Sequence, residues 1–179
     1  MSFSPIPCYS FKEITDISAK FLTKQGIKFL MLDLDNTIAA YNEHIPAPQV
    51  TQWFDEIHKS GIITYIISNS LKKHRVWAFA QELDIGMKMD ARKPSPKCVL
   101  EAMEQTGFTK EVCAFIGDQI FTDTLAANRA GVTSIIVKPR QFTNPLLAVR
   151  YVAESPFRAM CKNISKNSRN TDPIKGKTA

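Results

Sequence analysis

Short apolar runs alternate along this chain with longer segments in which apolar residues recur every three or four positions. The runs are rich in β-branched and aromatic residues and have the length of strands. They predict five strands, at residues 27–33, 62–67, 87–89, 112–116 and 133–137. Most of these runs are apolar at successive positions, which is typical of strands buried on both faces of a parallel sheet.

The segments between the runs predict amphipathic helices, several of which end at a glycine. We place these helices at residues 48–60, 72–83, 95–106, 122–130 and 145–152. Near the N-terminus, Ser10 and Glu13 form a capping-box pattern. It predicts one more helix, with an apolar face of Phe11, Ile14, Ile17 and Phe21, that ends at Gly26.

Strands that alternate with helices predict an α/β fold, a three-layer doubly wound parallel sheet with right-handed crossovers. The expected strand order, numbered along the chain, is 3-2-1-4-5, which opens a crevice between the first and fourth strands. We assign residues 1–155 to one domain that includes the N-terminal helix, and residues 156–179 to a basic, disordered tail.

Composition is that of an ordinary soluble globular protein, with 44% apolar and 22% charged residues among 179. No apolar run is long enough for a transmembrane helix, and no basic segment leads into an apolar one as in a signal peptide. The cysteines form no CxxC pair, which suits a reducing compartment. We therefore expect a cytoplasmic protein. The four cysteines are Cys8, Cys98, Cys113 and Cys161.

Positive charge gathers at the C-terminal end. The net charge is +6, and from Arg150 onward there are seven basic residues against Glu154 and Asp172. The tail is either a solvated, disordered end or a segment attracted to nucleic acid or to anionic lipid at the inner face of a membrane. We expect no nucleic-acid partner, and the sequence does not give the oligomeric state.

Polar residues that stand out follow the predicted strands directly. Because parallel strands bring their carboxyl ends to one edge of the sheet, we expect these side chains to converge. Three carboxylates and a backbone carbonyl around one point suit Mg²⁺, which prefers oxygen ligands in an octahedron. The residues are Asp33, Asp35, Ser68, Lys93, Asp118 and Asp123.

Each of these residues also has a simpler interpretation. Ser68 can cap the next helix, Lys93 can be a charge in a surface loop, and Asp123 can be an acid at a helix N-terminus. Their joint order along the chain favours a common site.

Four stretches, DLDNT, ISNS, RKPSP and GDQIFTD, together resemble the signature of the haloacid dehalogenase superfamily, subfamily IIIA. Details across roughly residues 10–155 resemble its YqeG branch, which includes mitochondrial phosphatidylglycerophosphate phosphatases. Ser70 stands where that branch would have Asn, and Arg92 where Lys is more usual. Neither residue is at a position to which the resemblance assigns a catalytic or binding role.

The resemblance implies a role for each matching position. Asp33 would attack phosphorus to form an aspartyl-phosphate, and Asp35 would protonate the leaving oxygen and then activate water. Mg²⁺ would bind Asp33, the backbone carbonyl of Asp35 and Asp118, with Asp123 as a further ligand or as the residue that orients a water. The phosphate-binding set would be Ser68, Asn69, Lys93 and Thr37, with Thr37 closing the turn by hydrogen bonding.

The spacing between the matched stretches indicates what kind of substrate can reach the site. The gap from Asp33 to Ser68 and the gap from Ser68 to Lys93 hold only the predicted helices and strands, so neither has room for a cap domain. An open crevice suits phosphate on a large or surface-bound molecule. The resemblance to the YqeG branch makes phosphatidylglycerophosphate, in phospholipid biosynthesis, the leading hypothesis. Alternatives are a capless phosphatase for soluble sugar, nucleotide or protein phosphates, a receiver-like binding module, and a catalytically silent scaffold.

Overall fold

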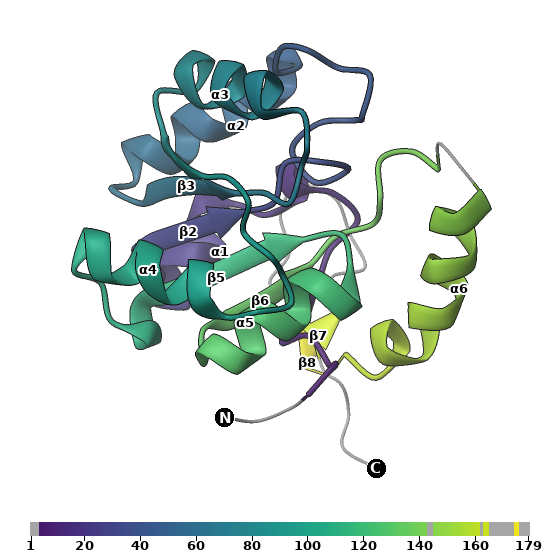
Figure 1. Cartoon of the computed structure of the whole chain (residues 1–179). Coiled ribbons are helices and arrows are strands. Elements are labelled where there is room, and N and C mark those ends of the chain that lie inside the picture. The colour runs from purple at the N-terminus through teal and green to yellow at the C-terminus, as the bar shows by residue number, and fades with distance from the viewer. Residues whose placement is uncertain (1–3, 143–144, 162, 165–173, 176–179) are drawn as a thin grey trace.

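Five parallel strands form the centre of one sheet in a computed structural model that describes residues 4–142, 145–161, 163–164 and 174–175 (Figure 1). In spatial order they are β4-β3-β2-β5-β6. Their bounds are β2 Phe29–Leu32, β3 Ile63–Ile67, β4 Gly86–Lys88, β5 Cys113–Gly117 and β6 Thr133–Ile136. This order is the predicted 3-2-1-4-5, so the fold prediction is confirmed.

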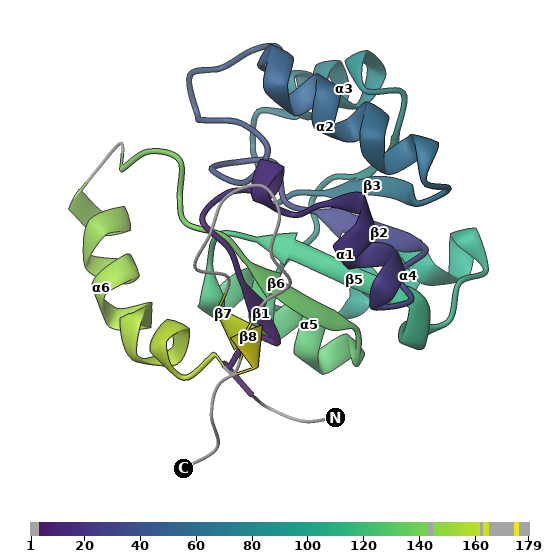
Figure 2. The same cartoon turned by 180° about the vertical axis from the view of Figure 1, so that it is seen from behind.

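Shorter strands extend the sheet beyond β6. β1 (Tyr9–Ser10) pairs with β6 in parallel, β7 (Asn163–Ile164) pairs with β1 in parallel, and β8 (Ile174–Lys175) pairs with β7 antiparallel. These edge strands place the N-terminal and C-terminal segments side by side, far from β4 (Figure 2).

Helices cover both faces of the sheet and make three layers. One apolar core joins α1 (Ala19–Lys24), α2 (Pro48–Lys59) and α3 (Lys73–Glu82) to one face, and a second joins α4 (Lys97–Thr106) and α5 (Leu125–Ala130) to the other. Figure 1 is seen from the side of α4 and α5, and α1 lies in front of the sheet in Figure 2. Burying both faces explains the continuous apolar runs of the strands.

The N-terminal prediction was wrong in its boundaries. Instead of one helix from Ser10, residues 8–11 pair with the edge of β6, where the amide of Phe11 donates to the carbonyl of Ile136 at 2.9 Å. A 3₁₀ turn, Ile14–Asp16, follows, and α1 begins only after Ser18, whose Oγ accepts from the amide of Phe21 at 3.1 Å. The backbone groups of residues 8–11 find hydrogen-bond partners along the edge of β6, a pairing that the local sequence does not reveal.

The last helix, α6 (Pro145–Ala159), is longer than predicted and crosses the expected domain boundary after residue 155. It continues through Pro156, which has no amide proton and so leaves the carbonyl of Val152 without its helical partner. The hydroxyl of Ser155 donates to that carbonyl instead, at 2.7 Å. α6 lies to one side, beyond the carboxyl ends of the strands (Figure 1). Most of the basic tail lies outside the described residues. Within them, no helix has the length and apolar character to cross a membrane.

Candidate active site

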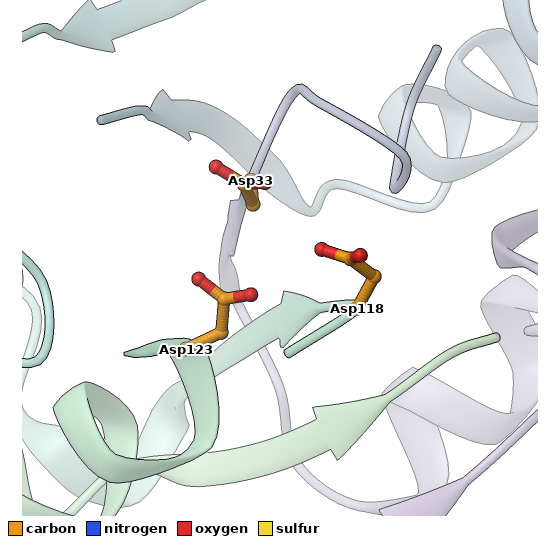
Figure 3. A group of neighbouring side chains, drawn as sticks. All are labelled: Asp33, Asp118 and Asp123. Atoms are coloured by element: carbon orange, nitrogen blue, oxygen red, sulfur yellow. The ribbon is translucent and has the colours of Figure 1, made fainter. Parts of the chain in front are cut away.

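Three aspartates meet at the carboxyl ends of the two central strands. Asp33 follows β2, Asp118 follows β5, and Asp123 lies in a π-helical turn, Ile120–Thr124, between β5 and α5. Their carboxylates point toward one another (Figure 3), and one ligand oxygen from each lies within 4.8 Å of the others. The predicted convergence of these three residues is therefore seen in the structure.

Asp123 is fixed by its own turn. Its amide donates to the carbonyl of Gln119 at 3.0 Å, and its Oδ2 accepts from the amide of Gln119 at 3.0 Å. Gly117 makes room for it, because a Cβ at that position would overlap the Asp123 side chain. A glycine at the end of β5 is thus required for this carboxylate to reach the cluster.

Lys93 joins two of the acids. Its Nζ lies 2.6 Å from Oδ1 of Asp33 and 2.7 Å from Oδ1 of Asp123. Asn69 holds the same residue by its backbone: the Lys93 amide donates to Oδ1 of Asn69 at 3.0 Å, and Nδ2 of Asn69 donates to the Lys93 carbonyl at 3.1 Å. Asn69 therefore positions Lys93 through its backbone.

Burial and crowding set the charges of this cluster. Burial raises the pKa of Asp33 to about 7, although Lys93 opposes the shift, and burial together with Asp123 and Asp33 raises the pKa of Asp118 well above its usual value. Burial alone would lower the pKa of Lys93, but Asp123 and Asp33 outweigh it and the pKa is raised. Three carboxylates against one ammonium leave an excess of negative charge.

That excess is suited to a divalent cation. Oδ1 of Asp118 is buried and has no hydrogen-bond partner among the described residues. A buried carboxylate oxygen without a partner is costly, and a hard cation at the cluster would satisfy it. The three acids thus fit a metal bound by oxygen ligands.

Asp35 points to a different partner. Its Oδ1 accepts from Nη1 of Arg75, a buried side chain of α3. The same guanidinium donates to the carbonyls of Ala40 at 2.6 Å and Glu43 at 2.7 Å. Sequence reasoning gave Arg75 no role. The sequence signals were the Arg75-Val76 pair, which belongs to the family resemblance, and the place of Arg75 one turn before Phe79 on the predicted helix. In the structure the Arg75 guanidinium lies 5.1 Å from the centre of the Phe79 ring.

Two predicted phosphate-binding residues, Ser68 and Thr37, differ in their hydrogen bonding. Ser68 is buried, and its Oγ accepts from the amide of Ser70 at 3.0 Å, which shapes the loop after β3 but does not cap α3. The predicted hydrogen bond of Thr37 was wrong, because its Oγ1 has no partner among the described residues. The turn is closed by backbone instead, where the amide of Asn36 donates to the carbonyl of Ala39 at 2.7 Å.

A pocket of about 490 Å³ opens above the cluster, with Asp33, Asp35, Lys93 and Asp123 among its lining residues. Residues outside the predicted set complete its wall. They are Tyr41, Ser70, Leu71, Lys72, Gln119, Thr122 and Arg150, together with the predicted Asn69. The pocket is large enough for more than a phosphoryl group.

Helix α6 contributes to this site, which sequence reasoning missed because it treated the C-terminal charges as a tail. Nη1 of Arg150 donates to Oε1 of Gln119, and Nη2 of Arg158 donates to the carbonyl of Asp118. Glu154, also buried, accepts from the amide of Phe121 at 3.2 Å and pairs with Arg158 at 3.3 Å. α6 thus braces the loop that carries Asp118 and Asp123.

Comparison with known proteins agrees with this geometry. Residues 11–131, which contain all three aspartates, match the family model of haloacid dehalogenase-like hydrolases. The chain belongs to the haloacid dehalogenase-like hydrolase family. It is 35% identical over 134 residues to the probable phosphatase YqeG of Bacillus subtilis, a match that covers 75% of this chain and 77% of that protein.

Two further similarities are more distant. A stretch of 60 residues is 32% identical to glyceraldehyde 3-phosphate phosphatase of Methanopyrus kandleri, which is 34% of this chain and 26% of that protein. The crystal structure of 3-deoxy-D-manno-octulosonate 8-phosphate phosphatase from Moraxella catarrhalis, with magnesium and phosphate ions, has a TM-score of 0.55 and 20% identity, covering 83% of this chain and 82% of that one. This second likeness supports the fold.

Proposed function

We propose that this phosphatase of the haloacid dehalogenase family hydrolyses phosphate monoesters through a phosphoryl intermediate on Asp33, with Mg²⁺ as its cofactor. The observation that carries the proposal is the position of Lys93, which contacts Asp33 and Asp123 at 2.6 and 2.7 Å while Asp118 completes the acidic cluster. Asp33, Asp118, Asp123 and the backbone carbonyl of Asp35 would hold the ion. When bound, Mg²⁺ neutralises charge on the phosphoryl oxygens.

The reaction would have two halves. In the first, a carboxylate oxygen of Asp33 attacks phosphorus, the bond from phosphorus to the leaving oxygen breaks, and Asp35 gives that oxygen its proton. In the second, Asp35 takes a proton from water, the resulting hydroxide attacks phosphorus, and phosphate leaves with Asp33 restored. Lys93 offsets the negative charge of the phosphoryl group in both halves.

Substitution of the nucleophile tests this. We expect Asp33→Asn to fold and to lose turnover of 4-nitrophenyl phosphate by several orders of magnitude, since an amide cannot form the intermediate. Asp55→Asn, which changes an exposed acid on α2, is the matched control. Each protein would be assayed with Mg²⁺ and with a chelator. Near-native rates of Asp33→Asn would remove it as the nucleophile.

For the substrate we propose phosphatidylglycerophosphate. The YqeG resemblance favours it, and the pocket lies open between loops and α6. Three side chains of α6 are largely exposed although apolar: Leu146 at 74%, Val149 at 66% and Val152 at 68%. Exposed apolar side chains on a helix, beside a basic C-terminal segment, suit peripheral contact with an anionic membrane.

The lipid proposal is tested with the purified protein, Mg²⁺ and phosphatidylglycerophosphate in mixed micelles. We expect phosphate release that Asp33→Asn abolishes. Release from soluble phosphomonoesters alone would favour the second candidate, a phosphatase for small soluble phosphates. The similarity to glyceraldehyde 3-phosphate phosphatase supports that candidate. The match to a hydrolase family argues against the receiver and scaffold alternatives.

A further inference from the structure

We propose that Lys72 and Arg150 form a second anion-binding site at the mouth of the pocket. This site would take an additional anionic group of the substrate, a phosphodiester or a carboxylate, while the phosphomonoester lies at Asp33. The inference rests on the proposed phosphatase function and adds a substrate class to it: phosphomonoesters that carry a second negative charge.

The basic side chains of the pocket differ in whether they are already paired. Lys72, Lys93 and Arg150 are the basic residues among the described residues that line it. Lys93 is buried and already pairs with Asp33 and Asp123. Lys72 is exposed and has no ion-pair partner in the described part of the chain, and the Arg150 side chain is 38% exposed. Two cations are thus left to face a ligand.

The charges around the pocket would leave its mouth positive. A divalent cation at Asp33, Asp118 and Asp123, with Lys93 beside them, would make the floor of the pocket close to neutral. Asp35 is paired with Arg75. Glu154 lies 3.9 Å from Arg150, but it also pairs with Arg158 at 3.3 Å and accepts from the amide of Phe121. Its single charge therefore does not cancel the positive charge of the mouth.

Arg150 and Lys72 line the pocket from two different elements. Gln119, which directly follows Asp118, accepts from Arg150 and from the hydroxyl of Thr122 at 3.3 Å. Arg150 is therefore oriented by the same loop that carries the metal-binding acids. Lys72 comes from another element, the residue before α3. A planar guanidinium can donate two parallel hydrogen bonds to a phosphodiester or carboxylate, and a flexible lysine adds a point charge.

The pocket has room for a second anionic group. The pocket of about 490 Å³ holds both cations at its wall together with the catalytic acids. A phosphoryl group fills only a part of such a volume, and the rest is available to the remainder of the substrate. A second anion in the same molecule would then gain from Lys72 and Arg150 without displacing Lys93 from Asp33.

The experiment uses two matched substrate pairs that differ in the second anion. The lipid pair is phosphatidylglycerophosphate, which has a phosphodiester, and phosphatidate, which has none, in the same micelles. The soluble pair is 3-phosphoglycerate, which has a carboxylate, and glycerol 3-phosphate, which has none. The readout is the ratio of kcat/KM within each pair, with Mg²⁺ present, for the native chain, Lys72→Gln, Arg150→Gln and the double variant.

We expect the native protein to prefer the doubly anionic member of at least one pair, and Arg150→Gln to lower that ratio about tenfold, the effect of losing about 1.4 kcal/mol of binding. The double variant should show almost no preference. Lys20→Gln, which removes an exposed charge on α1, should leave the ratio unchanged. A response in the lipid pair identifies a phosphodiester ligand, and a response in the soluble pair identifies a carboxylate.

Turnover without any preference, or a preference that both substitutions leave intact, would overturn the second anion site and leave the phosphatase proposal standing. Absence of Mg²⁺-dependent turnover with all four substrates and with 4-nitrophenyl phosphate would refute the phosphatase proposal itself, and the second anion site with it.

Discussion

The guanidinium of Arg75 binds the carboxylate of Asp35, which connects the helix α3 to the residue proposed to carry the proton. Arg75 also donates to the carbonyls of Ala40 and Glu43, so one buried side chain fixes both Asp35 and the loop that follows it. The fork of a guanidinium can make these contacts at once, and the single ammonium of a lysine cannot. Arg75 is therefore a positioning residue for Asp35.

Arg75→Lys should lower kcat for an alkyl phosphate by about 10-fold to 100-fold, since a misplaced acid loses part of a contribution of typically 10²–10⁴. With 4-nitrophenyl phosphate, whose leaving group needs little protonation, the loss should be smaller. Comparing the two substrates separates positioning of Asp35 from general damage to the fold. Arg92→Lys, at an exposed position near the site, is the control. Equal losses with both leaving groups would contradict this role.

The acidic cluster should make the metal-free protein less stable as pH rises. The pKa of Asp33 is raised from 3.8 to about 7 by burial, and that of Asp118 is raised in the same direction. The folded state therefore binds more protons than the unfolded state between these values. Stability present at pH 4 is lost as the pH rises toward 7, and Mg²⁺ should restore it.

Asp118→Asn tests that relation. In the presence of a chelator at pH 8, we expect a Tm at least about 3 °C above that of the native chain, since about 1 kcal/mol shifts the Tm of such a domain by about 2–4 °C. Near pH 4 the difference should vanish. The variant should also respond less to Mg²⁺. Asp55→Asn should behave as the native chain does at both pH values. A Tm of Asp118→Asn below that of the native chain at pH 8 would show that ionisation of Asp118 does not destabilise the folded state.

Much of this site could be predicted because the rule that governs it is topological. Asp33 and Lys93 are 60 positions apart, yet both follow strands of one parallel sheet and lie in contact. The apolar runs identify the strands, and the carboxyl edge then gathers the polar residues after them. The same reasoning placed Asp118 and Asp123.

The sequence did not reveal the contacts that depend on how helices pack against the rest of the domain. Arg75 and Arg150 lie on amphipathic helices, where a local pattern separates apolar from polar faces but does not say what a polar side chain will meet. α6 follows β6, the last of the five central strands, and only the short edge strands β7 and β8 come after it. β1 is a similar case, because its partner β6 lies more than a hundred residues away. Local propensity is too weak to decide such pairings.

The glycine at position 117 gives a sharp test of the metal site. Gly117→Ala would force its Cβ against Asp123, so we expect Mg²⁺ affinity to fall about tenfold or more, as for a misplaced ligand. Gly26→Ala is the control, since its Cβ would meet no atom within 4 Å and only the positive φ of 75° is strained. Calorimetric titration with Mg²⁺ distinguishes the two. Equal affinities would mean that Asp123 does not bind the ion.

Variants of Arg158 test whether α6 belongs to the catalytic domain. It lies beyond the boundary expected from sequence, yet it donates to the carbonyls of Asp118 and Val137 and pairs with Glu154. Arg158→Gln should destabilise the protein by about 1–3 kcal/mol, because Glu154 keeps its buried charge and loses its partner. Mg²⁺ affinity should fall as well, since Asp118 loses its brace. Arg158→Lys keeps the charge and should recover part of both losses. Urea unfolding and Mg²⁺ titration measure both losses, and a chain ending at residue 155 should lose more stability and more Mg²⁺ affinity than Arg158→Gln does. If that shorter chain behaved as the native chain does, α6 would lie outside the domain.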